Sequence, residues 1–292
     1  MSYTRFLDFQ FSIKDHISIH NGAGDFPEIR VTNQYATACI SLYGGQMLSF
    51  MPVQANEDLL FLSPDAVFDD GTAIRGGIPV CWPWFGQAIG PGLPAHGYAR
   101  TQTWSIERTV QLADGSSQVV LQLPPGDYGV AEGLALTLHI HVGKTLLLEL
   151  QTENVGDTPQ WVSQALHSYL HVRKVSNCVI KGLDQVSFID KLQDDKAHIQ
   201  QGDLFIDQSV DRVYLTENNT ICINDPDFNR SISIQNTGND ATVVWNPGEA
   251  LYDLTADSFN QMVCIESAHL NRDGTLLQPN DVKLVSTEIS VG

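Results

Sequence analysis

Positive charge is scarce in this chain of 292 residues. It carries 16 lysines and arginines against 34 aspartates and glutamates, which gives a formal net charge of −18. Nucleic acids and anionic membranes are bound through basic surfaces, so this composition argues against both as partners. An anionic small molecule would need a local cluster of cationic side chains to hold it.

Long apolar runs are also missing. The N-terminal stretch MSYTRFLDFQFSIKDH lacks the apolar segment of a secretory signal, and no later run has the length of a membrane span. The 5 cysteines form no CxxC pair, and most lie in apolar, strand-like segments. We therefore expect buried, reduced thiols and a cytoplasmic protein. The cysteines are Cys39, Cys81, Cys178, Cys222 and Cys264.

Amphipathic helices of more than two or three turns are absent as well, whereas strand signals recur along the whole chain. In LTLHIHV, residues 136–142, apolar and polar residues alternate, and GKT joins this run to LLLELQTEN as a tight hairpin. No linker rich in Pro, Gly and Ser divides the sequence. The pattern predicts an all-β protein, a large antiparallel β-sandwich forming a single domain over residues 1–292.

The two arginines that interrupt a long stretch without lysine or arginine, residues 31–107, lie in loops rich in Gly and Pro. Arg75 belongs to AIRGGIPVCWPWFGQAIG, in which the Gly-Gly pair allows a sharp turn and Trp82 offers a face for a sugar ring. His96 and Arg100 belong to PAHGYAR. A guanidinium suits a phosphate, although a packed loop, a turn-capping histidine and ordinary ion pairs are the alternatives.

Histidines mark a predicted strand in WVSQALHSYLHV, residues 161–172, where His167 and His171 share a face. A histidine on a concave face can act as an acid or base near neutral pH, and a satisfied core histidine is the alternative. A metal site would use His139 with His141, or His167 with His171, but no acidic residue accompanies either pair at a recognisable interval. We therefore expect no metal.

Carboxylates complete the set of candidates. QMVCIESAH places Glu266 at the end of an apolar strand, where partial burial would raise its pKa and make it a usable base. An exposed residue at the end of a strand is the alternative. Asp211 in VDRVYL and Trp245 in VVWNPGE either line a polar pocket or belong to an ordinary ion pair and a turn.

Taken together, IRGGIPVCWPWFG, HGYAR, QALHSYLHV, VDRVYL, VVWNP and VCIE resemble, in order, the hexose-6-phosphate mutarotases, also called glucose-6-phosphate 1-epimerases, of the aldose 1-epimerase superfamily. The resemblance covers residues 30–290 and implies a β-supersandwich. It implies that His167 is the general acid and Glu266 the general base. It also implies that Arg75 and Arg100 bind a phosphate, while His96 and Asp211 bind sugar hydroxyls.

The reaction so implied interconverts the α and β anomers of an aldohexose 6-phosphate by ring opening and reclosure, without a cofactor. We expect a phosphorylated hexose as the partner and a monomer or weak homodimer. The alternatives are a mutarotase of unphosphorylated aldoses, a carbohydrate-binding β-sandwich without catalysis, and a glycoside hydrolase that uses Asp211 and Glu266 as its two carboxylates.

Overall fold

The structure, a computed structural model, describes residues 2–87, 90–126, 131–255 and 257–292. Strands dominate it, and the pairs between named strands are antiparallel. Among the described residues one α-helix occurs, α1 (Tyr3–Phe11), which the strand pattern did not predict. Its N-cap residue, Ser2, accepts the backbone N–H of Arg5. Short 3-10 turns are η1 (Ala23–Asp25), η2 (Ala99–Thr101), η3 (Val175–Asn177) and η4 (Ser258–Gln261).

The strands form three sheets. The first consists of β1 (Ile17–Asn21), β2 (Pro27–Thr32), β3 (Ala36–Ser41) and β4 (Gln46–Pro52). The second has the order β13 (Lys196–Ile199), β12 (Ser187–Asp190), β14 (Val210–Tyr214), β17 (Ala241–Asn246), β18 (Met262–His269), β10 (Gln164–His171) and β5 (Val80–Cys81). The third has the order β11 (Val179–Lys181), β15 (Thr220–Asp225), β16 (Arg230–Thr237), β19 (Val282–Val291), β9 (Leu146–Asn154), β8 (Leu134–Val142), β7 (Ser117–Gln122) and β6 (Ser105–Gln111).

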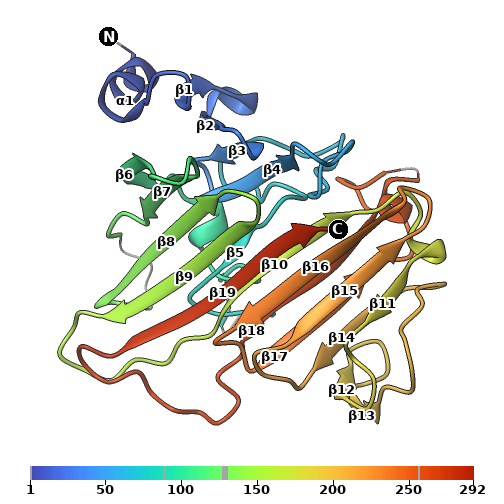
Figure 1. The fold of residues 1–292 in the computed structure, drawn as a ribbon. Helices are drawn as coiled ribbons and strands as arrows, with labels where there is room; N and C mark the ends of the chain where they lie inside the picture. The colour runs from blue at the N-terminus through green and yellow to red at the C-terminus, as the bar shows by residue number, and fades with distance from the viewer. Residues whose placement is uncertain (1, 88–89, 127–130, 256) are drawn as a thin grey trace.

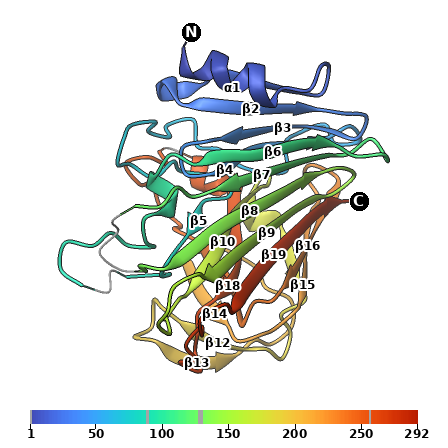
Figure 2. The same cartoon turned by 90° about the vertical axis from the view of Figure 1, so that its left-hand side faces the viewer.

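The two large sheets form the sandwich, with β10 and β18 of the seven-stranded sheet packed against β19 of the eight-stranded one (Figure 1). Helix α1 and the four-stranded sheet lie together at one end of the molecule, beside β6 and β7 (Figure 2). The predicted all-β antiparallel sandwich is therefore confirmed, and the separate four-stranded sheet is an addition that the sequence pattern did not distinguish.

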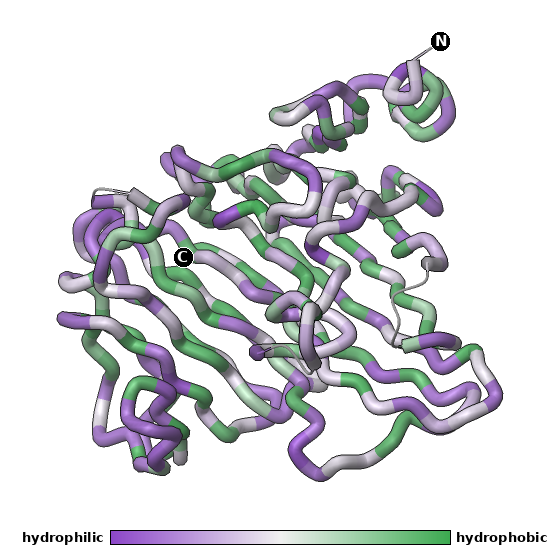
Figure 3. Tube along the Cα trace, turned by 180° about the vertical axis from the view of Figure 1, so that it is seen from behind, coloured by the Kyte–Doolittle hydropathy of each residue, from purple (hydrophilic) through white to green (hydrophobic). Residues whose placement is uncertain are grey.

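Alternation along the strands explains how the sheets pack. In β8, Leu136, Leu138, Ile140 and Val142 are buried while the residues between them are half-buried. Strands β8 and β9 pair with Val142 opposite Leu146, which confirms the hairpin expected at GKT. The hydropathy of the chain alternates in the same way along the strands (Figure 3). One face of each strand thus supplies the core between the sheets.

In the seven-stranded sheet, β10, β17 and β18 are buried on both faces, whereas β12 and β13 at one edge are partly exposed. In β10, Leu166 and Leu170 join the main core, whereas Ala165 and Tyr169 belong to smaller apolar clusters on the other face. Loops cover this second face, and the candidate site lies beneath them. Because every side chain of such a strand has a prescribed neighbour, the register of the sheet fixes which groups meet.

The cysteines are all free thiols in the described residues, as expected. Three are buried, but Cys39 and Cys222 are only half-buried, so the expectation of complete burial is wrong for those two. Burial raises the pKa of the Cys81 thiol to about 12. Within the described part of the chain, no helix combines the length and the apolar character needed to cross a membrane.

Candidate active site

Two rows of side chains cross the second face of the seven-stranded sheet and underlie a cavity of about 660 Å³. Residues paired across strands share a face, as do residues two apart along a strand. The first row is His167, Glu266, Val243 and Val213. The second row is Tyr169, Cys264, Trp245 and Asp211. The cavity has a volume suited to a small ligand such as a sugar.

His167 and Glu266 are direct cross-strand partners on β10 and β18, with Nε2 and Oε1 3.3 Å apart. Both residues are buried, at 8% and 1% exposure, so the alternative of an exposed strand-end glutamate is excluded. Glu266 lies in the middle of β18 rather than at its end, which corrects the predicted position. The central position matters because it puts the carboxyl group beside the imidazole rather than in a loop.

Burial shifts the pKa values of Glu266 and His167 in opposite directions. Desolvation raises the pKa of the Glu266 carboxyl well above its ordinary value, and the charge of Asp211 raises it further. Desolvation lowers the pKa of the His167 imidazole well below 6.5, helped by His96, Arg100 and Arg75. Both shifts favour the uncharged form of each group. Such a contact can exchange a proton internally.

The loops that carry Arg75 and Arg100 each contain a turn at a glycine that no larger residue could replace. Gly77 has φ of +61°, and a Cβ there would lie 2.0 Å from the Met47 carbonyl oxygen. Gly97 has φ of +72°, and a Cβ there would lie 1.9 Å from the Trp82 carbonyl oxygen. The predicted sharp turn at the Gly-Gly pair is confirmed, and Arg75, directly before it, lines the cavity.

Arg75 is held firmly. Its Nε lies 3.1 Å from the Asp253 carboxylate, and its Nη1 donates to the Tyr169 hydroxyl at 3.0 Å. The guanidinium carbon lies 6.0 Å from the ring centroid of Trp245. This arrangement differs from a loop arginine bonded to carbonyl oxygens. Since a guanidinium carries five N–H donors, these two contacts leave donors for a ligand.

Arg100, on η2, also lines the cavity, and its Nη2 donates to the Ala95 carbonyl oxygen at 2.9 Å. Within the described ranges no carboxylate lies at ion-pair distance from it. Its charge is thus not neutralised locally, in contrast to that of Arg75.

His96 lies on the rim, where its Nδ1 accepts the backbone N–H of Gly86 at 3.3 Å. Its ring is 5.9 Å from that of His167, centroid to centroid. Burial lowers the pKa of His96 to about 3, and Arg100 and Arg75 contribute to the shift. Because Nδ1 of the neutral imidazole accepts this bond, its Nε2–H is left to donate a hydrogen bond to a hydroxyl group.

Asp211 and Trp245 meet as cross-strand partners on the cavity floor. Burial raises the pKa of Asp211, whereas nearby Lys191 lowers it. The Trp245 ring stands edge-on to those of His167 and Tyr169, at 6.2 Å and 6.1 Å between centroids. The alternative in which Asp211 pairs with its neighbour Arg212 is wrong, because Arg212 faces the other way and pairs with Asp190.

Trp82 does not line the cavity, which corrects its prediction as a sugar-binding aromatic. It is 1% exposed, belongs to the main core, and its indole N–H donates to Thr152 on β9 at 3.0 Å. The reason is the alternation of neighbouring residues: Cys81 occupies the cavity side of the sheet with Ala165, so Trp82 points between the sheets. Phe85, three residues later, lines the cavity instead.

Several residues in or beside the cavity were not predicted as site residues, although Tyr169 and Ser163 were expected on the strand face of His167. Tyr169 stacks on His167 at 4.9 Å with an interplanar angle of 14°. Lys191 follows β12, and its backbone N–H donates to the Asp211 carbonyl oxygen, which extends the second row by one position. Ser163 binds the backbone N–H of Phe85, and Asp253 holds Arg75 from behind. The spacing of Tyr169 from His167, two residues in one strand, was the available signal for Tyr169.

Metal-binding potential is found at a different place from the predicted alternatives. Among the described residues, one group of His, Cys, Asp or Glu side chains is close enough to hold an ion, namely His167, Cys264 and Glu266. His141 lies on β8, and its Nε2 is 2.9 Å from the Ser116 hydroxyl oxygen. Neither His139, His141 nor His171 belongs to the group of potential ligands found among the described residues, whereas His167 does.

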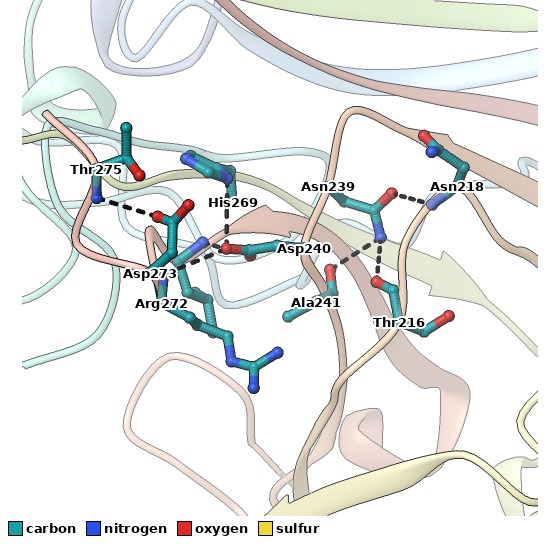
Figure 4. A network of polar contacts seen from close by, with 10 residues as sticks. Thr216, Asn218, Asn239, Asp240, Ala241, His269, Arg272, Asp273 and Thr275 are labelled. Atoms are coloured by element: carbon teal, nitrogen blue, oxygen red, sulfur yellow. Dashed lines mark hydrogen bonds and ion pairs between the residues drawn. The ribbon is translucent and has the colours of Figure 1, made fainter. Parts of the chain in front are cut away.

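A second histidine–carboxyl contact lies further along β18. His269 Nδ1 is 3.4 Å from Asp240 Oδ2, and the same carboxylate accepts the backbone N–H groups of Leu270 at 2.7 Å and Arg272 at 3.4 Å (Figure 4). Asn239, next in the chain, holds the neighbouring turn through Asn218. Asp240 therefore anchors the segment that brings Leu270 to the cavity rim.

The fold is that of galactose mutarotase-like proteins. A crystal structure of such a protein from Clostridium acetobutylicum, 14% identical, matches with a TM-score of 0.73 over 94% of this chain and 98% of that one. At that identity the likeness concerns the fold alone.

Sequence similarity defines the family. The aldose 1-epimerase family matches residues 27–290. A protein from Escherichia coli (strain K12), provisionally named glucose-6-phosphate 1-epimerase, is 35% identical over 254 residues, 82% of each chain. A crystal structure of a provisionally assigned mutarotase from Salmonella typhimurium is 30% identical, with a TM-score of 0.87 over 97% of this chain and 95% of that one. The chain belongs to the aldose 1-epimerase family, and is thus an isomerase.

Proposed function

We propose that this protein interconverts the α and β anomers of an aldohexose 6-phosphate, with glucose 6-phosphate as the first substrate to test. The observation that carries the proposal is the 3.3 Å contact between His167 and Glu266 on the floor of a cavity that Arg75 and Arg100 also line. The provisional names of the E. coli and S. typhimurium relatives support the choice of substrate.

In the proposed reaction, Glu266 takes the proton of the anomeric hydroxyl and His167 gives a proton to the ring oxygen. The C1–O5 bond breaks, the C1–C2 bond rotates, and the ring closes on the other face of the aldehyde. Both oxygens are bonded to C1, so an acid and a base that lie side by side can serve both. Each proton transfer contributes roughly 10²- to 10⁴-fold.

The reaction needs one proton on the pair, and the opposing pKa shifts of the two groups supply it on Glu266. Arg100 and Arg75 are among the charges that lower the pKa of His167. A bound phosphate that neutralises them raises the pKa of His167, so the imidazole is a better proton acceptor when the substrate is bound. Arg100 also lowers the pKa of Glu266, so the same neutralisation raises the pKa of that carboxyl group.

The phosphate is held by Arg100 and Arg75 in this proposal. Arg100 contributes the larger net charge because Asp253 already neutralises Arg75. Lys191 is a third cation on the cavity wall, and its ion pair with Asp195 is exposed, at 45% and 61%, so that it competes weakly with a ligand. His96 and Asp211 bind sugar hydroxyls, and Trp245 provides an apolar wall. No cofactor takes part.

We further propose that the chain acts as one domain, as a monomer or weak homodimer, in the cytoplasm. The free thiols on five separate segments support a reducing compartment.

The test is polarimetry of freshly dissolved α-glucose 6-phosphate, with and without the protein, in parallel with α-glucose at the same concentration. The proposal expects faster mutarotation of the phosphate ester and a much smaller effect on the free sugar. Equal acceleration of both sugars would overturn the phosphate assignment, and acceleration of neither would overturn the reaction.

A further inference from the structure

Three chemically different donors lie close together at and beneath the cavity floor: His167 and Glu266 line the cavity, and Cys264 is buried beside them. One ligand atom each of His167, Cys264 and Glu266 lies within 4.8 Å of the others, and all three residues are buried. The register of the sheet produces this cluster: His167 pairs with Glu266, and Cys264 lies two residues earlier on β18, on the same face. The proposed isomerase chemistry makes no use of the Cys264 thiol.

We propose that His167, Cys264 and Glu266 form an inhibitory binding site for a thiophilic divalent cation, with Zn²⁺ as the best-fitting ion. Binding of the metal depends on these three side chains alone. Its consequence for catalysis rests on the proposed function, because the metal takes the imidazole and carboxyl groups that are to move protons.

The distances suit a tetrahedral ion. Zinc binds imidazole nitrogen and carboxylate oxygen at roughly 2.0–2.1 Å, so two such ligands on one ion lie about 3.3 Å apart. His167 Nε2 and Glu266 Oε1 are already 3.3 Å apart. The sulfur of Cys264 lies within 4.8 Å of both ligand atoms and has to approach them to complete a three-ligand set. A fourth position faces the cavity and takes water, as in open zinc sites.

The charges also match. A thiolate and a carboxylate together neutralise a divalent cation, and a neutral imidazole adds none, so the buried complex has no net charge. Burial raises the pKa of both Cys264 and Glu266, and their protons are released when the metal binds. Arg75 and Arg100 stand nearby and oppose the ion, which makes its binding reversible rather than structural.

The surroundings of the ligands favour the same conclusion. Within the part of the chain that the structure describes, His167 Nδ1 and Glu266 Oε2 have no hydrogen-bond partner. In proteins that hold a metal permanently, the ligand atoms that do not touch the metal are hydrogen-bonded to neighbouring groups. Loss of these hydrogen bonds weakens metal affinity by roughly 10- to 100-fold. This trio therefore has the donors of a metal site without the support of a permanent one, as expected of an inhibitory site.

The first experiment titrates the purified protein with Co²⁺, whose thiolate complexes absorb in the near ultraviolet. We expect one Co²⁺ per chain with a thiolate charge-transfer band, displaced by Zn²⁺ and removed by chelator. The band should disappear in Cys264→Ala and persist in Cys81→Ala, a matched control because Cys81 is equally buried on the neighbouring edge of the sheet. Cys264→Ser provides a second, nearly isosteric variant if the alanine protein does not fold.

The second experiment measures Zn²⁺ inhibition of anomerisation. We expect Cys264→Ala to retain activity and to need at least ~10-fold more Zn²⁺ for half inhibition, because one of three ligands is gone. A charge-transfer band that survives in Cys264→Ala, or equal Zn²⁺ sensitivity of the wild type and this variant, would overturn the inference. Absence of anomerisation with an intact cobalt band would instead reject the proposed function and leave the metal site standing.

Discussion

Two histidine–carboxyl contacts on strand β18 have nearly the same length and different surroundings. His167 and Glu266 approach to 3.3 Å in the cavity, and His269 and Asp240 approach to 3.4 Å near the end of the strand. The Asp240 carboxylate also binds two backbone N–H groups, as Figure 4 shows. Among the described residues, Glu266 Oε2 has no hydrogen-bond partner.

The difference shows that distance alone does not define an acid–base pair. A carboxylate that backbone donors satisfy is stabilised as an anion and serves the structure. A buried carboxyl group without such donors keeps a proton that it can give away or take back. The predictions below separate these two roles.

The largest expected effect is the loss of activity on replacing the proposed base. Glu266→Gln and His167→Ala should each lower kcat by about 10²- to 10⁴-fold, because each removes one proton transfer. The measurement is the initial rate of anomerisation of α-glucose 6-phosphate. Asp240→Asn is the matched control and should change kcat by less than about 5-fold; a loss equal to that of Glu266→Gln would erase the distinction between the two pairs.

The next effect concerns the phosphate. Arg100→Ala should raise KM for glucose 6-phosphate by about 10- to 100-fold, since it removes a charge-assisted contact of roughly 1.5–3 kcal/mol. Turnover of free glucose should change little, and Arg108→Ala, an exposed arginine on β6, serves as the control. Arg100 is a cleaner test than Arg75, whose removal leaves Asp253 buried without its partner. Equal effects on both sugars would contradict phosphate binding.

Replacing Asp240 in the His269–Asp240 pair should change the stability of the fold rather than the activity. Asp240→Ala leaves the backbone N–H groups of Leu270 and Arg272 without an acceptor, so it should lower the free energy of unfolding by about 1–3 kcal/mol. Urea denaturation measures this directly. An unchanged midpoint would show that the network in Figure 4 contributes nothing to stability.

The last expected effect has the opposite sign. The folded state raises the pKa of Glu266 above its unfolded value, so the wild type loses stability as pH rises above that unfolded value. A glutamine side chain does not titrate and avoids this loss. Glu266→Gln should therefore match the wild type near pH 4 and be more stable than the wild type at pH 7. Thermal unfolding at the two pH values checks the sign, and a less stable variant at pH 7 would contradict it.

Sequence patterns predicted the parts of the molecule that depend on neighbours in the chain. The β8–β9 hairpin followed from alternation and a three-residue turn, and the turn at Gly77 followed from the Gly-Gly pair. Seven of the eight predicted site residues line one cavity, because the motifs that carry them follow one another in the order of a known family. Their roles remain predictions.

The misses have a common cause, which is that face and register are set by distant strands. Trp82 looked like a binding aromatic, but its neighbour Cys81 took the cavity side. Lys191 joins the site through the pairing of its backbone with Asp211, and Asp253 through a loop far along the chain. The cluster of Cys264 with His167 likewise depends on the β10–β18 register. The spacing of residues along the chain does not predict any of these contacts.

The central claim is that His167 and Glu266 exchange protons with the anomeric centre of a phosphorylated hexose. Two-dimensional NMR exchange spectroscopy on glucose 6-phosphate at anomeric equilibrium tests it most directly, because it observes interconversion without a coupling enzyme. Cross-peaks between the α and β anomeric protons should intensify with the wild type and fall to the spontaneous level with Glu266→Gln. Equal cross-peaks with both proteins would contradict the claim.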